Sequence, residues 1–200
     1  MPAAQRAQMQ ARISEVAEAL FTRDGYAKVS LRRIAKEIGC TPMALYGYYD
    51  SKFDILQSLW DGVFDQLFKK LGAITAPMST PAASAARSEN VQLYLQSLCT
   101  TYIEFWLERP DNYRLVFMAE GVTQPDVSLF LGAPDIVARY SLFQKTISRL
   151  CPNADGSKIK LKLDFMLSAL HGIAHNNITI SGYDWSSPED QVGLVVKAVV

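Results

Sequence analysis

The sequence predicts an all-α protein with a small N-terminal helical domain and a larger helical domain behind it. Apolar residues recur at intervals of three and four along most of the chain, which places them on one face of a helix. No segment alternates apolar and polar residues for long enough to indicate a strand. Caps, prolines and glycines stand where the periodic segments begin and end. With 200 residues, 49% of them hydrophobic, the chain is large enough to bury a sizeable core.

The composition excludes several classes of protein. No run of about 18 apolar residues is present and the first twenty residues contain no uninterrupted apolar stretch, so we expect neither a membrane span nor a signal peptide. The three cysteines, Cys40, Cys99 and Cys151, are odd in number and far apart, which is typical of thiols in a reducing compartment. No phosphate-binding loop and no metal-type cysteine pair occurs. We therefore expect a cytoplasmic protein without a cofactor or a structural metal.

Two helices are expected before residue 40. In the first, Ile13, Val16, Ala17, Leu20 and Phe21 share one face, and Gly25 stands where the helix should stop. The second begins after Ser30 as its N-cap and ends at Gly39. Its buried face is expected to contain Leu31, Ile34, Ala35 and Ile38.

A third, short helix follows almost at once. Thr41 offers a cap oxygen and Pro42 suits the first helical position, where its missing N–H costs nothing. Ala44 and Leu45 are expected to face inward. The tyrosines that follow, Tyr46, Tyr48 and Tyr49, are too close together for all of them to lie in a core.

The fourth helix is long and leads out of the small domain. It opens at Ser51 with Asp54 three residues later, a capping-box pattern, and its apolar face continues to Leu71. The segment 72–90 is rich in Pro, Ala, Ser and Thr and is predicted to be a long loop. We place the domain boundary after residue 53, giving domains 1–53 and 54–200. Further helices are expected at about 90–108, 111–119, 134–150, 157–179 and from 188 onward; the last reaches Val200, which favours a longer natural protein.

Two short helices joined by a three- or four-residue turn with a glycine, braced by a first helix, form a helix-turn-helix, whose second helix enters the DNA major groove. The alternative is a helical hairpin that only packs within a bundle. Residues 1–53 contain 8 Lys and Arg against 5 Asp and Glu, whereas residues 54–200 contain 12 against 15. This mildly basic front end permits DNA binding without proving it.

The segment 29–56, "VSLRRIAKEIGCTPMALYGYYDSKFDIL", resembles the DNA-binding signature of the TetR family of bacterial transcriptional regulators. The match includes the Ile34–Ala35 pair, Gly39, the aromatic pair at 48 and 49, and Ser51–Lys52. The resemblance implies two sets of DNA contacts. Positions that hold phosphates correspond to Ser30, Tyr46, Tyr48 and Lys52. Positions that face base edges correspond to Arg32, Thr41, Pro42, Met43 and Ala44, while Tyr49 corresponds to a mostly structural aromatic.

The expected recognition helix has an unusual composition. Residues 41–48 contain no Arg, Asn or Gln, so this helix cannot make bidentate hydrogen bonds to guanine or adenine. Met43 and Ala44 can contact thymine methyl groups. Our hypothesis is that Arg32 supplies the main hydrogen-bonded readout and that DNA shape supplies the rest; the alternative is an arginine bound to phosphate.

The segments 102–118 and 170–177 are similar to the C-terminal ligand domain of the WHG-type branch of that family, although Leu170 stands where this branch often has Trp. The resemblance implies an effector cavity that is mostly apolar with a few polar groups. Most aromatic and sulfur residues there are expected to be plain core. The candidates for lining the cavity are Tyr102, Phe105, Trp106, Phe117, Met118, Phe143, Phe165, Met166, His171 and His175.

The histidine pair permits a different function. His171 and His175 are four residues apart on one helix face, and Asp164 lies near the same face, so a zinc site or a ligand-carrying or metal-dependent catalytic bundle is the alternative. Gly172 occupies the position where a metalloprotease motif has its glutamate. We prefer hydrogen-bonding roles for both histidines, with no bound metal and no enzyme activity.

The preferred reading is a homodimeric, sequence-specific transcriptional regulator. Helix-turn-helix dimers bind double-stranded DNA with two half-sites about one helical turn apart, so a palindromic operator is expected. The segment 157–179 is apolar nearly all round, which indicates burial on two sides. By resemblance, this segment and 188–200 pair with their copies in the partner subunit. Also by resemblance, a repressor released by a small-molecule effector is expected.

Overall fold

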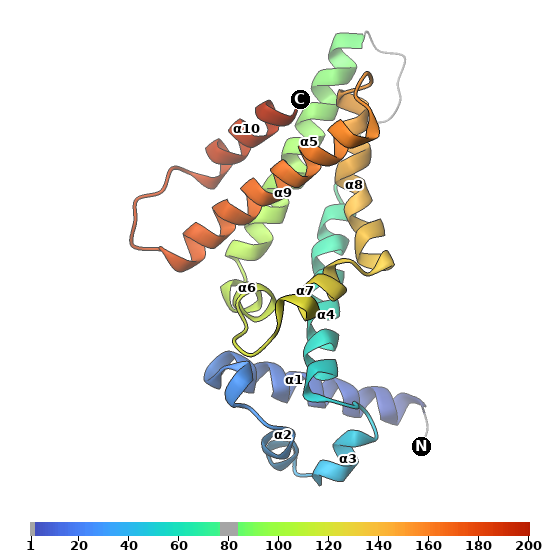
Figure 1. Cartoon of the computed structure of the whole chain (residues 1–200), viewed down its shortest axis with the longest axis vertical. Coiled ribbons are helices and arrows are strands. Elements are labelled where there is room, and N and C mark those ends of the chain that lie inside the picture. Colours follow the sequence, from blue (N-terminus) through green and yellow to red (C-terminus); the bar gives the residue numbers. More distant parts are fainter. Residues whose placement is uncertain (1–2, 77–83) are drawn as a thin grey trace. The chain divides into compact units, whose positions relative to one another are not determined.

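The structure is a computed structural model that describes residues 3–76 and 84–200. All regular structure within those ranges is helical (Figure 1), as the periodicity predicted. No helix in the described ranges is long and apolar enough to cross a membrane. The elements are α1 (Ala3–Asp24), η1 (Tyr26–Lys28), α2 (Leu31–Ile38), α3 (Pro42–Tyr46), α4 (Lys52–Gly72), α5 (Ser84–Leu107), α6 (Pro110–Phe117), α7 (Gln124–Leu131), α8 (Pro134–Leu150), α9 (Gly156–Thr179) and α10 (Pro188–Val199).

The helices form two compact units. The first contains α1 to α3, α4 as far as Gln66, and the α6–α7 segment 111–131. The second contains the end of α4, α5, and α8 to α10. This division by contacts differs from the linear boundary expected after residue 53, because helices distant in sequence pack against the N-terminal ones.

In the first unit, α2 and α3 lie on the same side of α1 (Figure 1). The predicted apolar stripe of α1 is buried at Ile13, Ala17, Leu20 and Phe21. The indole of Trp60 on α4 is also buried, and its Nε1 donates to the carbonyl of Leu115 on α6 at 3.1 Å.

Two further contacts tie the α6–α7 segment to the N-terminal helices. The side-chain amide of Asn112 donates to Glu18 of α1 at 2.9 Å. Gly121 has φ +88°, and a Cβ there would come within 3.2 Å of the Ala27 Cβ. A side chain at position 121 would therefore have a strained backbone conformation and a tight contact with Ala27.

The second unit is built around α5, which packs against α8, α9 and α10. α10 runs back alongside α9 (Figure 1). One face of α9 is buried, including Met166, Leu170 and Ile173, whereas Leu161 and Phe165 are 69% and 49% exposed. The apolar residues of α9 therefore lie on two faces: one packs within the subunit and the other is exposed to solvent.

Two elements differ from the sequence-based expectation. Residues 84–90 were expected to be loop, but they form the first turns of α5 because their Ala and Ser residues tolerate a helix. The part of the expected loop at 77–83 lies outside the described residues. Helix α7 was not expected. The sequence contains its capping box in Thr123 and Asp126. In the structure each of these side chains accepts a hydrogen bond from the other residue's backbone N–H.

Candidate nucleic-acid interface

The turn between α2 and α3 is made by three residues, each with its own local interaction. Gly39 takes the left-handed conformation, φ 83° and ψ 32°, and its N–H donates to Ala35 O. Cys40 N also donates to Ala35 O, at 2.9 Å. Thr41 Oγ1 accepts from Ala44 N at 3.2 Å and caps α3, with Pro42 in its first turn. This reversal ends one helix and starts the next within a few residues, as a helix-turn-helix requires.

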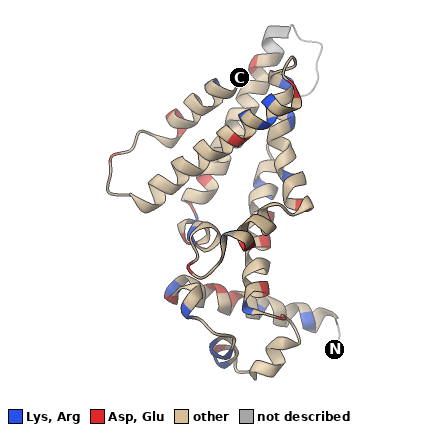
Figure 2. Ribbon diagram, in the orientation of Figure 1, with Lys and Arg blue, Asp and Glu red and all other residues tan. Residues whose placement is uncertain are grey.

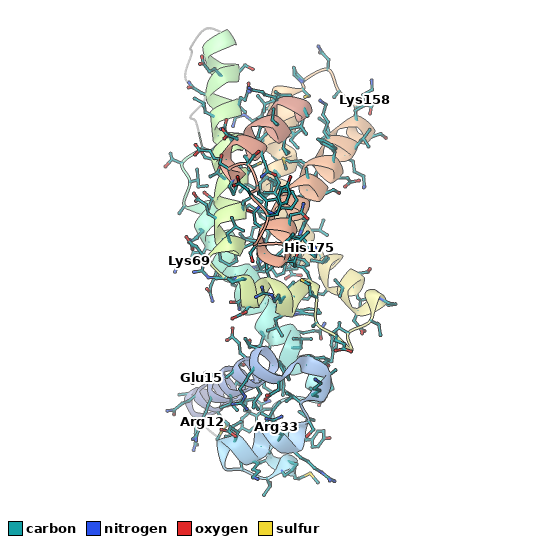
Figure 3. All side chains as sticks on the ribbon, turned by 90° about the vertical axis from the view of Figure 1, so that its left-hand side faces the viewer. Arg12, Glu15, Arg33, Lys69, Lys158 and His175 are labelled. Carbon is teal, nitrogen blue, oxygen red and sulfur yellow. The ribbon has the colours of Figure 1, made fainter. Side chains whose placement is uncertain are left out.

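The pair of helices has one buried and one exposed side. Ile34, Ala35, Ile38 and Leu45 are buried. A hydrogen bond of 3.0 Å from Arg12 of α1 to Ile38 O braces the end of α2, and Figure 3 shows Arg12 and Arg33 in this part of the chain. The buried side therefore fixes the orientation of α2 and α3 relative to α1.

The exposed side contains the residues expected to face DNA. Met43 is 79% and Tyr46 52% exposed, and Thr41 and Arg32 are exposed as well. The expectation that Ala44 faces inward is wrong, because in a helix of only five residues Leu45 alone reaches the core. An exposed Ala44 is available for the base contact that the resemblance implies.

Arg32 differs from its neighbour in its ion pairs. Arg33 is held by Asp24 at 2.7 Å, and Arg23 shares the same carboxylate at 3.0 Å. The hydrogen bond from Arg23, with the charges of both arginines, lowers the pKa of Asp24. Arg32 has no ion pair within the described ranges. Lys and Arg lie on α2 whereas α3 carries no charged residue (Figure 2), so the positive charge of this motif comes from α2.

Lys52 makes specific contacts inside the first unit. Its Nζ donates to Tyr26 O at 2.8 Å and to Val29 O at 3.0 Å, and it lies 4.0 Å from the centre of the Tyr26 ring. Burial lowers the pKa of this amine. The side chain therefore secures the segment η1 before α2, and a phosphate contact by Lys52 remains a prediction.

The tyrosine cluster is divided between structural and exposed roles. Tyr49 OH lies 3.2 Å from Ser14 Oγ and 3.4 Å from Ser58 Oγ, so it joins α1 to α4. Tyr48 is half-buried, and the guanidinium of Arg6 lies 5.3 Å from its ring centre. Sequence reasoning did not single out Arg6, because nothing in the first turns of α1 indicates a partner 42 residues later.

The residues expected to line an effector cavity fall into three groups. Tyr102, Phe105, Trp106, Phe143 and Met166 are buried together in the second unit. Phe165 and His175 lie on the exposed side of α9, His175 toward its C-terminal end (Figure 3). Phe117 and Met118 lie at the end of α6 and beyond it, in the first unit.

A polar chain crosses the aromatic core of the second unit. Tyr102 OH and His171 Nε2 are 2.9 Å apart, and burial lowers the pKa of His171 to about 4, so its ring is neutral at pH 7. Tyr140 was missed by sequence reasoning; burial raises its pKa to about 12, while a hydrogen bond with Tyr102 opposes the shift. A tyrosine in a mid-helix position gives no sequence signal that distinguishes such a role from simple packing.

The histidine-centred alternative gains no support from these contacts. No group of three His, Cys, Asp or Glu side chains suited to a metal occurs in the described part of the chain. Asp164 is paired with Lys160 on its own helix. His171 Nε2 lies 2.9 Å from Tyr102 OH, and His175 lies on the exposed side of α9.

Comparison with known proteins supports the interpretation of the N-terminal helices. Residues 13–59 match the family model for bacterial regulatory proteins of the tetR family. No curated protein matches the chain.

Solved structures share the fold over nearly the whole length. One, described as a tetR family transcription regulator from Shewanella sp. PV-4, has a TM-score of 0.68 and 17% identity, covering 94% of this chain and 96% of its own. The fatty acid degradation regulator FadR from Bacillus halodurans has a TM-score of 0.69 and 14% sequence identity, and the match covers 95% of this chain and 93% of FadR. A TetR-family transcriptional regulator from Bordetella parapertussis has a TM-score of 0.58 and 17% sequence identity, and the match covers 96% of this chain and 94% of that protein. The proteins that the chain resembles are regulators of transcription, not enzymes. Residues 13–59 thus match the family model for tetR regulatory proteins directly, and the chain as a whole has the fold of solved structures described as TetR-family regulators.

Proposed function

We propose that this protein is a cytoplasmic, homodimeric repressor that binds a palindromic operator and is released by a small-molecule effector. The observation that carries the proposal is the capped turn between α2 and α3, which buries Ile34 and Leu45 and exposes Arg32, Met43 and Tyr46. Met43 and Tyr46 are exposed on the same short helix and are therefore available to contact another molecule.

The proposed DNA contacts combine hydrogen bonds from α2 with apolar contacts from α3. Arg32 reads a base edge, and Met43 and Ala44 contact thymine methyl groups. Thr41 and Pro42 lie beside them at the start of α3. The hydroxyls of Ser30, Tyr46 and Tyr48, with the amine of Lys52, contact phosphates by resemblance. Because α3 lacks long polar side chains, sequence-dependent DNA shape supplies the remaining specificity.

Replacing Arg32 by Ala tests the proposed readout. We expect discrimination at one base pair to fall by roughly 1–3 kcal/mol, because a base-edge hydrogen bond is lost. Arg33→Ala is the matched control, since Arg33 is adjacent on α2 and held by Asp24; it should leave discrimination unchanged. Fluorescence anisotropy on cognate and scrambled duplexes measures both. Equal losses on the two duplexes for Arg32→Ala would assign Arg32 to phosphate instead.

Selection of bound DNA from a random duplex library is the test of the function as a whole. A regulator of this kind enriches a palindrome whose half-sites are about one helical turn apart. Its affinity should fall steeply with salt, because phosphate contacts release counterions. No enrichment at low salt would contradict the proposal and favour the alternative function centred on His171 and His175.

The exposed face of α9 is the proposed centre of the dimer. Leu161, Phe165, Ser168, Gly172 and His175 follow each other at intervals of four and three and are all exposed. Leu194 is exposed on the adjacent α10. Leu161, Phe165 and Leu194 are the large apolar side chains of this exposed surface, and together with the row on α9 they form a seam that a second copy can cover.

A charge placed on this seam should separate the subunits. We expect Leu161→Asp and Phe165→Asp to raise the dimer dissociation constant on the order of 100-fold, because each dimer would bury two unpaired carboxylates. Val137→Asp is the control, since Val137 is exposed on α8 of the same unit. Sedimentation equilibrium measures the constant. A dimer that tolerates both seam variants would place the interface elsewhere.

The proposed effector site lies in the second unit, around Tyr102, His171 and Tyr140. Aromatic side chains surround these polar groups, an arrangement suited to a largely apolar ligand oriented by a few hydrogen bonds. The effector would favour a conformation whose half-site separation no longer fits the operator, which couples two distinct sites.

A further inference from the structure

A second site is outlined where α5 meets the start of α10, within the second unit. Two cavities of about 350 Å³ and about 250 Å³ adjoin there, since Thr100 and Glu189 line both. We call this surface the α5–α10 groove and define it by Leu93, Thr100, Glu104, Leu107, Glu189 and Val192. Thr100, Glu104 and Leu107 are two, two and five residues from Tyr102, so they lie on the opposite side of α5 from the proposed effector site.

The charge of the groove is negative. Its lining includes the carboxylates of Glu104 and Glu189 and no Lys, Arg or His. Neither carboxylate has an ion pair or a side-chain hydrogen bond among the described residues, unlike Glu108 just after the end of α5, which is bound to Lys70 and Arg109. Two unpaired carboxylates beside one cavity favour a cationic ligand and repel an anion.

The start of α10 does not offer a competing anion site. Helix N-termini attract anions through their free N–H groups. Here Ser187 Oγ already accepts from Asp190 N at 3.1 Å and donates to the Asp190 carboxylate at 2.7 Å. Glu189 and Asp190 also place two negative charges in the first turn.

The floor of the groove is apolar. Ile103 and Val192 are buried beneath it, and Leu93 and Leu107 flank it with partly exposed side chains. An apolar floor between carboxylates fits a ligand with a charged head and a hydrocarbon tail. We propose that the α5–α10 groove binds an organic ammonium ion with a short alkyl chain, at a site separate from the proposed effector site around Tyr102.

Calorimetric titration of the full chain with n-hexylammonium chloride tests the site directly. Hexylammonium should bind, whereas hexanoate and hexanol should bind much more weakly because they lack the positive charge. Each further methylene should tighten binding about fourfold until the groove is filled. Added salt should weaken binding by screening the carboxylates. Hexanoate binding as tight as hexylammonium, or a wild-type protein that binds neither, would overturn the proposal.

Substitutions in the groove locate the binding. Glu104→Gln and Glu189→Gln should each weaken hexylammonium binding about threefold to fivefold, and the double variant about tenfold, because exposed ion pairs are modest. Thr100→Leu, which fills the shared part of the two cavities, should weaken binding without changing charge. Glu15→Gln on α1 in the first unit is the control and should bind normally. Unchanged binding in the double variant would refute the site.

Two further measurements separate this site from other outcomes. If the double variant changed the dimer dissociation constant and wild type bound no hexylammonium, the groove would be a contact between subunits, which contradicts the proposal. The random-duplex selection is run on the same preparations. Operator enrichment without hexylammonium binding would contradict only the proposed ammonium site in the α5–α10 groove. Hexylammonium binding without operator enrichment would contradict only the proposed regulatory function.

Discussion

Trp60→Ala should lower the free energy of unfolding of the first unit by about 3–5 kcal/mol, the usual cost of truncating a buried aromatic side chain. The indole is 1% exposed and packs edge-on against Phe53 and Phe130, with ring centres 5.8 Å and 5.1 Å away. Its Nε1 also satisfies the carbonyl of Leu115, one of the last four carbonyls of α6, which have no partner within their own helix. Removing the ring therefore opens a cavity and leaves a buried acceptor unpaired.

Trp60→Phe separates the two effects. The ring contacts remain in part, and we expect a loss of about 1–3 kcal/mol from the unpaired Leu115 carbonyl. Urea unfolding gives both values, and hydrogen exchange should show faster exchange in α6 and α7 for either variant. If Trp60→Phe left α6 as protected as in wild type, the hydrogen bond would not be what holds α6 in the first unit.

Acidification should destabilise the second unit through His171. Its pKa in the folded protein is about 4 against an ordinary value of 6.5, so the unfolded chain binds a proton more readily. Stability is therefore fully present above about pH 6.5 and is lost as the pH falls toward 4. The linkage amounts to about 2 kcal/mol at pH 5 and about 3 kcal/mol once both states are protonated.

The two histidines of α9 provide a matched comparison. His171→Gln removes the titrating group while an amide oxygen can still accept from Tyr102 OH, so the difference in stability between pH 7 and pH 5 should shrink by about 2 kcal/mol. His175→Gln changes the exposed histidine one turn away and is the control for losing a histidine from α9. Urea unfolding of the three proteins at both pH values measures it. Parallel pH profiles for wild type and His171→Gln would contradict the assignment.

The chain crosses between the two units three times. It passes from one unit to the other within α4 after Gln66, again after Pro110, and again after Leu131. The α6–α7 segment is therefore connected at both ends to the second unit while Trp60 and Glu18 hold it in the first.

Local signals in the sequence were sufficient for much of the DNA-binding motif. The caps at Ser30 and Thr41 and the left-handed Gly39 act within three or four residues, so spacing alone predicts them. The same kind of signal occurs at Thr123 and Asp126, whose capping box begins α7. Ala44 shows the limit of periodicity, because a helix of one turn has too few residues to define a face.

The sequence by itself determined the all-α class and the helix-turn-helix with its match to the tetR family model, because each depends on residue types at fixed short separations. Only the tertiary structure decided that Asp24 pairs with Arg33 rather than with Arg32. It also decided that the Lys52 amine donates to the carbonyls of Tyr26 and Val29, and that His171 forms a hydrogen bond with Tyr102. These contacts join residues from 9 to 69 positions apart. Such pairs form only when packing of the helices brings them together, and no local propensity selects one distant partner over another.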